Sequence, residues 1–125
     1  MVLDTCAVLW LAFNREKFSE GTLGQIDRCE QLYISTMSFW EIGIKIQKKK
    51  LVIPMVLDEF VRLYSVNETV SLVAPDLEII LLTLGLPWPH GDPVDRIVVA
   101  TAMKYDTQLV TGDSEIGKYY SRSVL

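Results

Sequence analysis

The sequence predicts one α/β domain over residues 1–125, with a parallel β-sheet of four to five strands and helices on both faces of the sheet. Short apolar segments typical of buried strands alternate with longer segments of helical periodicity, which is the order of β-α-β units. Of the 125 residues, 50% are hydrophobic and 22% are charged, a balance typical of a compact globular domain. No repeat, low-complexity tract or Gly/Ser linker divides the chain, so we place no domain boundary.

The N-terminal part of the chain contains two predicted strands separated by two predicted helices. The apolar segment 1–4 indicates a short buried strand, and an apolar-rich helix follows it and continues through Trp10. A second helix is expected around residues 18–29. The segment 31–35, QLYIS, predicts the second strand.

The next segment, SFWEIGIKIQKKK, fits two patterns. Apolar and polar residues alternate in EIGIKI, as they do in a half-buried strand. However, Phe39, Ile42 and Ile46 also form a helical stripe, and Ser38 followed by Glu41 matches a capping box at the start of a helix. The pattern favours a helix here and leaves a strand as the alternative.

The C-terminal part of the chain continues the alternation of helices and strands. Pro75 and Gly85 stand at the start and the end of one apolar helix, where these residue types are favoured. The segment that begins with Asp92 and Pro93 has the clearest helical pattern in the chain. The expected elements, in chain order, are helix 55–66, strand 69–74, helix 75–85, helix 92–105, strand 107–111 and a short strand at 122–125.

Composition and charge exclude several classes of protein. No apolar run approaches the roughly 20 residues that span a bilayer, and the first segment carries Asp4 and has no basic lead, so we expect a cytoplasmic protein without a membrane partner. A net charge of −4 argues against a broad basic surface for nucleic acid, but not against a nuclease whose acidic centre is neutralised by divalent cations. Cys6 and Cys29 fit no disulfide or metal-ligand spacing and are expected to be small buried side chains.

Acidic residues recur where the predicted strands end. Asp4 ends the first strand and Asp113 follows the strand at 107–111, and the carboxyl ends of parallel strands meet at the edge of a sheet where ligands bind. Glu41 and Asp95 each lie in the first turn of a helix near that edge. Carboxylate oxygens are the ligands that Mg²⁺ and Mn²⁺ prefer, so the pattern points to a metal site.

Each of these carboxylates also has a structural interpretation, which stays open at this point. Asp4 and Asp113 could cap the helices that follow them. Glu41 could complete the capping box or pair with Lys45 one turn further along the helix. Asp95 could complement the dipole of its own helix.

Three other polar residues in this region are expected to be structural. Asp92 precedes Pro93, which makes it a natural N-cap. His90, the single histidine, is interpreted as a turn or packing residue, and Glu115 as the start of a helix. Without a second histidine or a suitably spaced Ser or Cys partner, nucleophilic triad chemistry is set aside.

Three segments of the chain resemble the PIN-domain family, and in particular the VapC-type ribonuclease toxins of bacterial and archaeal toxin–antitoxin pairs. The segments are LDTCAVLWL, STMSFWEIGIKIQKKKL and LPWPHGDPVDRIVVATAMKYDTQLVTGD, and the match extends from Asp4 to about Ile116. The resemblance implies a PIN-like fold and a helix for the ambiguous segment. Cys6 stands where many relatives carry Asn or His. The metal site implied by the resemblance consists of Asp4, Glu41, Asp95 and Asp113.

The activity implied by the resemblance is that of a Mg²⁺- or Mn²⁺-dependent endoribonuclease, a hydrolase that acts as the toxin of a toxin–antitoxin pair. The four carboxylates would be both metal ligands and catalytic residues. Thr5, Lys45 and Arg96 lie beside them in the sequence or on the same helix face and are candidates for contact with RNA. The run Lys48–Lys50 is interpreted first as a solvated helix end and second as an RNA contact.

The expected partners are RNA, a cognate antitoxin and a second copy of the chain. Similar toxins form homodimers and are silenced by an antitoxin that lies across the toxin and places a basic side chain in the acidic pocket. Apolar early helices and Trp10, Trp40 and Trp88 predict exposed interfaces, here around Trp40 and Glu41 for the antitoxin. The alternative is that all three tryptophans belong to the core.

Two other classes of function remain open at the level of sequence. A phosphatase of the haloacid-dehalogenase type also uses a strand-end aspartate with Mg²⁺, but it requires a second aspartate two residues later, where this chain has Cys6. The second class is a non-catalytic binding module with a degenerate acidic site. Cleavage of RNA that a chelator abolishes would separate the nuclease from the binding module, and phosphate release from small phosphoesters would indicate the phosphatase.

Overall fold

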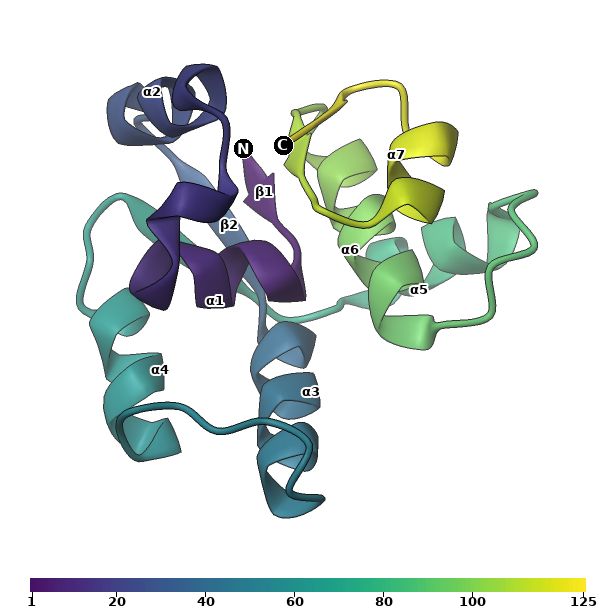
Figure 1. Ribbon diagram of the computed structural model, residues 1–125. Helices are drawn as coiled ribbons and strands as arrows, with labels where there is room; N and C mark the ends of the chain where they lie inside the picture. The colour runs from purple at the N-terminus through teal and green to yellow at the C-terminus, as the bar shows by residue number, and fades with distance from the viewer.

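A parallel sheet of five strands runs through the computed structural model, which describes all residues from 1 to 125 (Figure 1). The strands lie in the order β3-β2-β1-β4-β5, and every neighbouring pair is parallel. The prediction of a parallel sheet is confirmed, including its fifth strand at the C-terminus. The strands are β1 (Val2–Leu3), β2 (Leu32–Ser35), β3 (Val70–Val73), β4 (Leu109–Val110) and β5 (Ser123–Val124).

Seven α-helices cover the two faces of the sheet, as predicted (Figure 1). Helices α1 to α4 pack on one face and α5 to α7 on the other, and a short 3-10 turn, η1 (Arg15–Lys17), connects α1 to α2. The ambiguous segment after β2 is a helix, α3. The helices are α1 (Thr5–Phe13), α2 (Glu20–Arg28), α3 (Thr36–Gln47), α4 (Leu57–Ser65), α5 (Leu77–Gly85), α6 (Pro93–Lys104) and α7 (Ser114–Tyr119).

The two cores follow from the alternation of side chains along each strand. Neighbouring residues of a strand point to opposite faces, so Leu3 of β1 packs in the core with α1, α3 and α4, whereas Val2 packs in the core with α6. β4 repeats this arrangement with Val110 and Leu109. Strands that are buried on both faces are continuous apolar runs, which is why β1 and β4 could be recognised from two or three residues each.

Two helix boundaries differ from the prediction because the capping residue differs. Helix α3 begins at Thr36, and the Ser35 hydroxyl accepts a hydrogen bond from the backbone nitrogen of Met37 at 3.2 Å. Ser38 is buried inside the first turn, so the predicted capping box with Glu41 was wrong. Helix α5 begins after Asp76, whose carboxylate accepts from the nitrogen of Ile79, rather than at Pro75.

The helix predicted around residues 18–29 is α2 (Glu20–Arg28), which begins two residues later than predicted. Phe18 and Ser19 have extended backbone angles, and Ser19 caps α2 by accepting a hydrogen bond from the nitrogen of Thr22 at 3.1 Å. Phe18 is buried in the core between η1 and α2. The extended backbone of Phe18 and Ser19 separates the 3-10 turn from the helix. None of the helices combines the length and the apolar character needed to cross a lipid bilayer.

Candidate metal centre

Asp4 and Asp113 lie together at the carboxyl edge of the sheet because β1 and β4 are neighbours. The backbone nitrogen of Asp4 donates to the carbonyl of Val110 at 3.1 Å, which ties the end of β1 to the end of β4. Asp4 caps α1 by accepting from the nitrogen of Ala7, and Asp113 caps α7 by accepting from the nitrogen of Glu115, both at 2.7 Å. Capping uses one carboxylate oxygen of each, and a second oxygen remains for another role.

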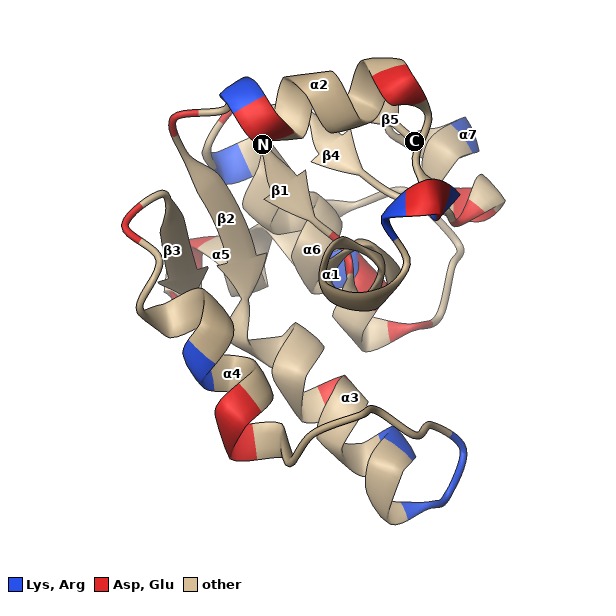
Figure 2. Cartoon of the chain, turned by 60° about the vertical axis from the view of Figure 1, so that its left-hand side comes forward, with Lys and Arg blue, Asp and Glu red and all other residues tan.

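A cavity of about 170 Å³ lies beside these caps and receives side chains from four segments of the chain. It brings together all four carboxylates that the sequence singled out, along with Asp92, and one lysine. The lining residues are Asp4, Thr5, Cys6, Glu41, Lys45, Asp92, Asp95 and Asp113. Glu41 lies in the middle of α3 (Thr36–Gln47) and not in its first turn as predicted, and Figure 2 shows the red segment part-way along this helix.

The tightest group of possible metal ligands in this region contains a histidine. Donor atoms of His90, Asp95 and Asp113 all lie within 4.8 Å of one another. His90 Nε2 is 2.7 Å from Asp95 Oδ2. His90, interpreted from the sequence as a turn or packing residue, thus also contacts a carboxylate that lines the cavity. Its one signal in the sequence was its position five residues before Asp95, in a loop whose conformation the sequence does not reveal.

The α3 side of the cavity contains an ion pair and a buried hydroxyl pair. Lys45 Nζ donates to Glu41 Oε1 at 3.0 Å, the pairing considered above for these residues one turn apart. The hydroxyl of Thr5 donates to the hydroxyl of Ser38 at 3.2 Å, which joins the start of α1 to the first turn of α3. Because Glu41 already accepts from Lys45, the cavity contains no free cation for its other carboxylates.

Burial and crowding of like charges shift the carboxylate pKa values upward. Asp4 is 4% exposed, and its burial raises its pKa to about 6. The charges of Asp95 and Asp113 also raise it, while hydrogen bonds from Thr111 and Ala7 act in the opposite direction. The pKa of Asp95 is raised as well, chiefly by burial, and the hydrogen bond from His90 opposes this shift. Glu41 pairs with Lys45 and Asp95 with His90, whereas Asp4, Asp92 and Asp113 have no basic partner, so the site keeps an excess of negative charge.

Comparison with known proteins identifies the family of this chain. The family model of the PIN domain matches residues 1–121, nearly the whole chain. The chain belongs to the PIN-domain family. This PIN domain is 25% identical over 123 residues to Ribonuclease VapC22 of Mycobacterium tuberculosis, and the match covers 93% of this chain and 88% of that protein.

Solved structures share the fold of this PIN domain at low sequence identity. A toxin–antitoxin complex from Klebsiella pneumoniae has a TM-score of 0.67 at 18% identity, covering 99% of this chain and 95% of the other. A crystal structure of VapBC2 from Rickettsia felis, bound to a DNA fragment from its promoter, has a TM-score of 0.66 at 12% identity, covering 99% and 96%. These similarities confirm the predicted PIN-like fold.

The donor set of this PIN domain fits a small divalent cation. Hard carboxylate oxygens dominate the cavity, and its only lysine is paired with Glu41. Such oxygens match Mg²⁺ or Mn²⁺, and an imidazole near them is compatible with Mn²⁺. A cation would also stabilise the charged form of Asp4, whose pKa is raised by burial and further by the charges of Asp95 and Asp113.

Two residues near the site have different surroundings from those predicted. Arg96, expected to contact RNA, is half-buried and donates to the carbonyl oxygens of Thr83, Leu86, Trp88 and His90, so its guanidinium is occupied by the loop before α6. Cys6, expected to be buried, is exposed and lines the acidic cavity, because α1 turns that face toward the site. Asp92 caps α6 through Val94 and Asp95, as predicted.

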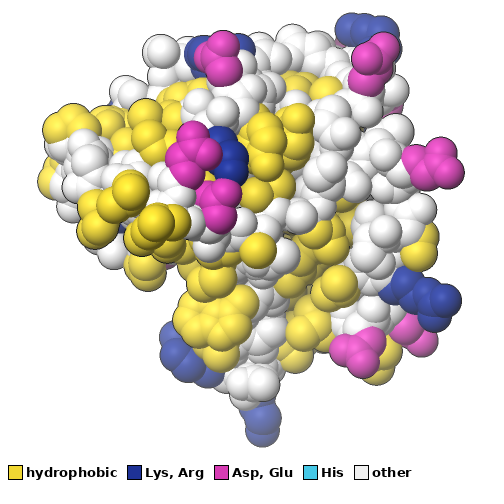
Figure 3. Space-filling view, turned by 180° about the vertical axis from the view of Figure 1, so that it is seen from behind, with side chains coloured by type: hydrophobic (Ala, Val, Ile, Leu, Met, Phe, Trp, Pro, Cys, Tyr) yellow, Lys and Arg dark blue, Asp and Glu magenta, His cyan; other side chains and the backbone are white.

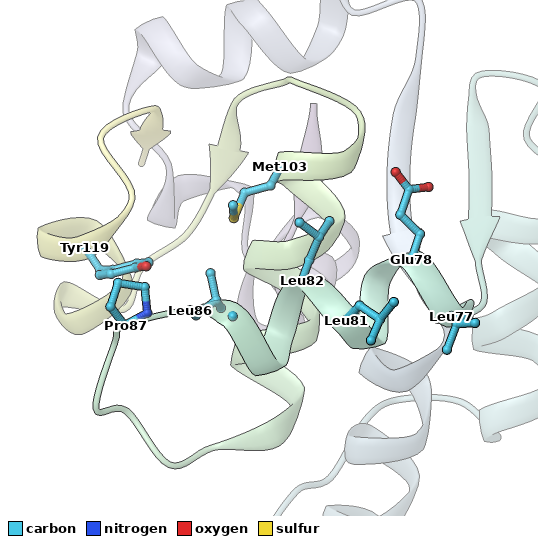
Figure 4. A pocket seen from close by; sticks show the side chains of 9 residues that line it. Leu77, Glu78, Leu81, Leu82, Leu86, Pro87, Met103 and Tyr119 are labelled. Carbon is cyan, nitrogen blue, oxygen red and sulfur yellow. The ribbon is translucent and has the colours of Figure 1, made fainter.

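A larger hollow of this PIN domain is apolar and lies away from the carboxylates. It has a volume of about 600 Å³ and is formed by α5 with parts of α6 and α7. Figure 4 shows leucine side chains of α5 along the hollow, Met103 of α6 above them, and Pro87 and Tyr119 together at one end. Leu77, Leu81 and Leu84 of α5 are exposed, and hydrophobic side chains cover much of the face seen in Figure 3.

The tryptophans divide between core and surface. Trp88 is buried, Trp10 is half-buried, and Trp40 on α3 is 56% exposed. The alternative that all three belong to the core is therefore wrong. Trp40 immediately precedes Glu41, so α3 carries an exposed aromatic ring as well as a carboxylate that lines the acidic cavity.

Proposed function

We propose that this PIN domain is a metal-dependent endoribonuclease and the toxin of a toxin–antitoxin pair. One observation carries the proposal: carboxylates from four separate segments converge on one cavity without a free cation to balance them. A protein gains little stability from such an arrangement, since like charges repel in a poorly solvated space. The name of the relative Ribonuclease VapC22 supports RNA as the substrate.

Asp4, Asp95 and Asp113 would hold Mg²⁺ or Mn²⁺, and Glu41 would complete the set from α3. When bound, such an ion lowers the pKa of a water molecule and offsets the charge that develops on the phosphate oxygens during hydrolysis. The protein would fix the positions of the carboxylates that hold the ion. The caps on α1 and α7 fix Asp4 and Asp113, because each of these carboxylates is tied to a backbone nitrogen at 2.7 Å.

Lysines of α3 provide a path for the RNA backbone that leads away from the cavity. Lys45 lies at the cavity, and Lys48, Lys49 and Lys50 follow at the end of the same helix, where none of them forms an ion pair. Figure 2 shows these lysines in blue at the far end of α3. The protein has a net charge of −4, so most of its surface repels RNA phosphates. This local group of lysines would therefore attract the RNA backbone to the α3 side of the cavity. The hydroxyl of Thr5 donates to Ser38, so in this proposal Thr5 holds α1 against α3 at the cavity.

The antitoxin would bind over the acidic cavity and the exposed ring of Trp40. Both solved neighbours described above come from assemblies of a toxin with its antitoxin or of VapBC type, which supports a partner of this kind. A basic side chain of the antitoxin could form charge-assisted hydrogen bonds with carboxylates that otherwise hold the cation. Such a partner would inhibit by replacing the metal charge as well as by covering the substrate path.

A second copy of the chain would bind at α5. Leu77 and Leu84 are more than two-thirds exposed, and the apolar hollow lies on the same face. Projecting leucines and a hollow on one surface suit a two-fold interface, in which each copy inserts its side chains into the hollow of the other. This proposal accounts for a large exposed apolar surface that the acidic cavity does not require.

Cleavage of a single-stranded RNA by the purified protein tests the proposed activity. We expect cleavage with Mg²⁺ or Mn²⁺ and none with a chelator. Asp95→Asn should lower the rate of RNA cleavage by orders of magnitude, because Asn has nearly the same size as Asp but lacks the negative charge that binds the cation. Asp92→Asn is the matched control and should be mild, because Asn remains a good N-cap for α6. Cleavage that resists the chelator, or full activity of Asp95→Asn, would refute the proposal, and phosphate release from small phosphoesters would favour the phosphatase.

A further inference from the structure

Two stacked aromatic rings, Trp88 and Tyr119, support His90 in the loop between α5 and α6. The ring of Trp88 is stacked on that of His90, with centroids 4.6 Å apart and planes inclined by 26°. Trp88 is also stacked on Tyr119 of α7, at 4.9 Å and 12°. Trp88 itself is buried. The plane of the imidazole is therefore set by a buried ring that is in turn held by a different helix.

Arg96 holds the backbone of the same loop. Its Nη1 donates to the carbonyl oxygens of Trp88 at 2.5 Å and of His90 at 3.2 Å. Its Nη2 donates to the carbonyl oxygens of Thr83 at 2.7 Å and of Leu86 at 3.2 Å, at the end of α5. A guanidinium has a rigid, planar set of donors, so these four bonds fix the loop relative to α6. Both the backbone and the ring of His90 are thus held in place.

We infer that His90 is a positioning residue that orients the Asp95 carboxylate toward the metal site through the Nε2–H···Oδ2 hydrogen bond of 2.7 Å. The inference rests on the metal site proposed above. Because an ionised carboxylate only accepts hydrogen bonds, Nε2 is the donor in this pair. Rotation about the last bond of an aspartate side chain is otherwise broad, and one bonded oxygen leaves the other directed into the cavity.

His90 is assigned to positioning rather than to metal binding because Nε2 is already used. To bind the ion through Nε2, the imidazole would have to give up Asp95 and leave the plane in which it stacks on Trp88. A donor that orients a metal-binding carboxylate typically contributes a factor of roughly 10–100 to metal affinity. The expected effect of losing His90 is therefore on the binding of the ion, before any RNA is present.

Mn²⁺ binding measured by EPR, without RNA, tests this role. His90→Phe keeps a flat ring for stacking on Trp88 and removes the donor, and it should weaken Mn²⁺ binding by roughly 10- to 100-fold. His90→Gln keeps an N–H donor and should bind within a few-fold of the wild type. Asp95→Asn is the reference for loss of the ligand itself. Circular dichroism and the Tm of each variant without metal establish that the fold is retained.

Four outcomes would overturn the inference. Equal Mn²⁺ affinity of His90→Phe and the wild type would exclude a role for His90 while leaving the metal site intact. Weak binding by His90→Gln as well would show that the donor is not what matters. Nitrogen coupling to Mn²⁺ in pulsed EPR of the wild type would make His90 a ligand instead. A wild-type protein that binds no Mn²⁺ would refute both this inference and the proposed function.

Discussion

The indole ring of Trp10 lies directly against Gly112, in the turn between β4 and Asp113. A Cβ atom added to Gly112 would lie 2.1 Å from Cη2 and 2.7 Å from Cζ3 of Trp10, well inside van der Waals contact. The φ angle of Gly112 is not positive, so glycine is required here for close approach and not for its backbone conformation. Trp10 also packs edge-on against Phe18 at 5.8 Å, which holds the ring in place. An aromatic residue of α1 thereby determines the position of the turn that carries Asp113.

Substitution of Gly112 should disturb both stability and the metal site. We expect Gly112→Ala to lower the free energy of unfolding by about 1–3 kcal/mol, as is typical of overpacking, and to weaken Mn²⁺ binding by displacing Asp113. Urea denaturation measures the first effect and EPR the second. Adding Trp10→Leu should recover part of the loss, which a double-mutant cycle detects.

Gly21 of α2 is the control for Gly112. A Cβ at Gly21 would meet no atom within 4 Å, and helix propensity favours alanine there by up to about 1 kcal/mol. Gly21→Ala should therefore be neutral or stabilising and leave Mn²⁺ binding unchanged. If Gly112→Ala were as stable as Gly21→Ala, the proposed steric role of Trp10 would be wrong.

The metal-free protein should lose stability as the pH rises through the range in which Asp4 titrates. Its pKa is raised from 3.8 to about 6, so between these values the folded state binds more protons than the unfolded state. The free energy of unfolding therefore falls as the pH increases from about 4 to 6, by about 3 kcal/mol at most. Urea denaturation in chelator between pH 4 and 7 measures the slope.

Asp4→Asn should remove the part of this dependence on pH that Asp4 contributes, and the raised pKa of Asp95 should leave a smaller one. Asn retains the oxygen that caps α1 but carries no charge, so the variant should be more stable than the wild type at pH 7 without metal, while losing activity. This combination distinguishes a residue retained for function from one retained for folding. A variant that is less stable than the wild type at pH 7 would contradict the assigned cause, the burial of a charge.

The lysines at the end of α3 should contribute to RNA affinity in a salt-dependent way. In an Asp95→Asn background that does not cleave, Lys48→Gln with Lys50→Gln should weaken binding of single-stranded RNA. The slope of log affinity against log salt should decrease by about 1.4, or about 0.7 for each lost phosphate contact. Fluorescence anisotropy at several salt concentrations measures both quantities.

A pair of basic residues at the opposite end of the molecule provides the matched control. Lys17→Gln with Arg28→Gln removes the same charge near α2, which lies far from α3 in Figure 1. We expect RNA affinity and its salt slope to change little. Equal effects of the two pairs would mean that only net charge matters and that α3 has no special role.

The exposed leucines of α5 should control the oligomeric state. We expect a dimer in sedimentation at micromolar concentration, and a monomer after Leu84→Lys, because a charge would enter an apolar interface. Leu84 is 76% exposed, so this substitution does not disturb the core of one copy. Val52→Lys, at a residue 91% exposed in the loop after α3, is the control and should remain dimeric. A wild-type protein that sediments only as a monomer would refute the interface.

The sequence by itself determined the parallel sheet and most of the carboxylate site. Two-residue strands such as β1 could be recognised because burial on both faces produces a continuous apolar run. The convergence of Asp4 and Asp113 could be predicted because residues that follow parallel strands must meet at one edge of the sheet. The first inference uses only residues that are adjacent in the chain, and the second uses only the rule that parallel strands end at the same edge of a sheet. Neither requires knowledge of the conformation of a loop.

Only the tertiary structure decided which partners the remaining polar residues find. His90 meets Asp95, and Arg96 donates to backbone carbonyls of the loop between α5 and α6, because this loop has one path among many that its sequence permits. Ser35 at the end of β2 caps α3, whereas the hydroxyl of Ser38 accepts a hydrogen bond from Thr5 of another helix. Such contacts join segments whose relative position is set by packing of the whole core, so no local pattern in the sequence encodes them.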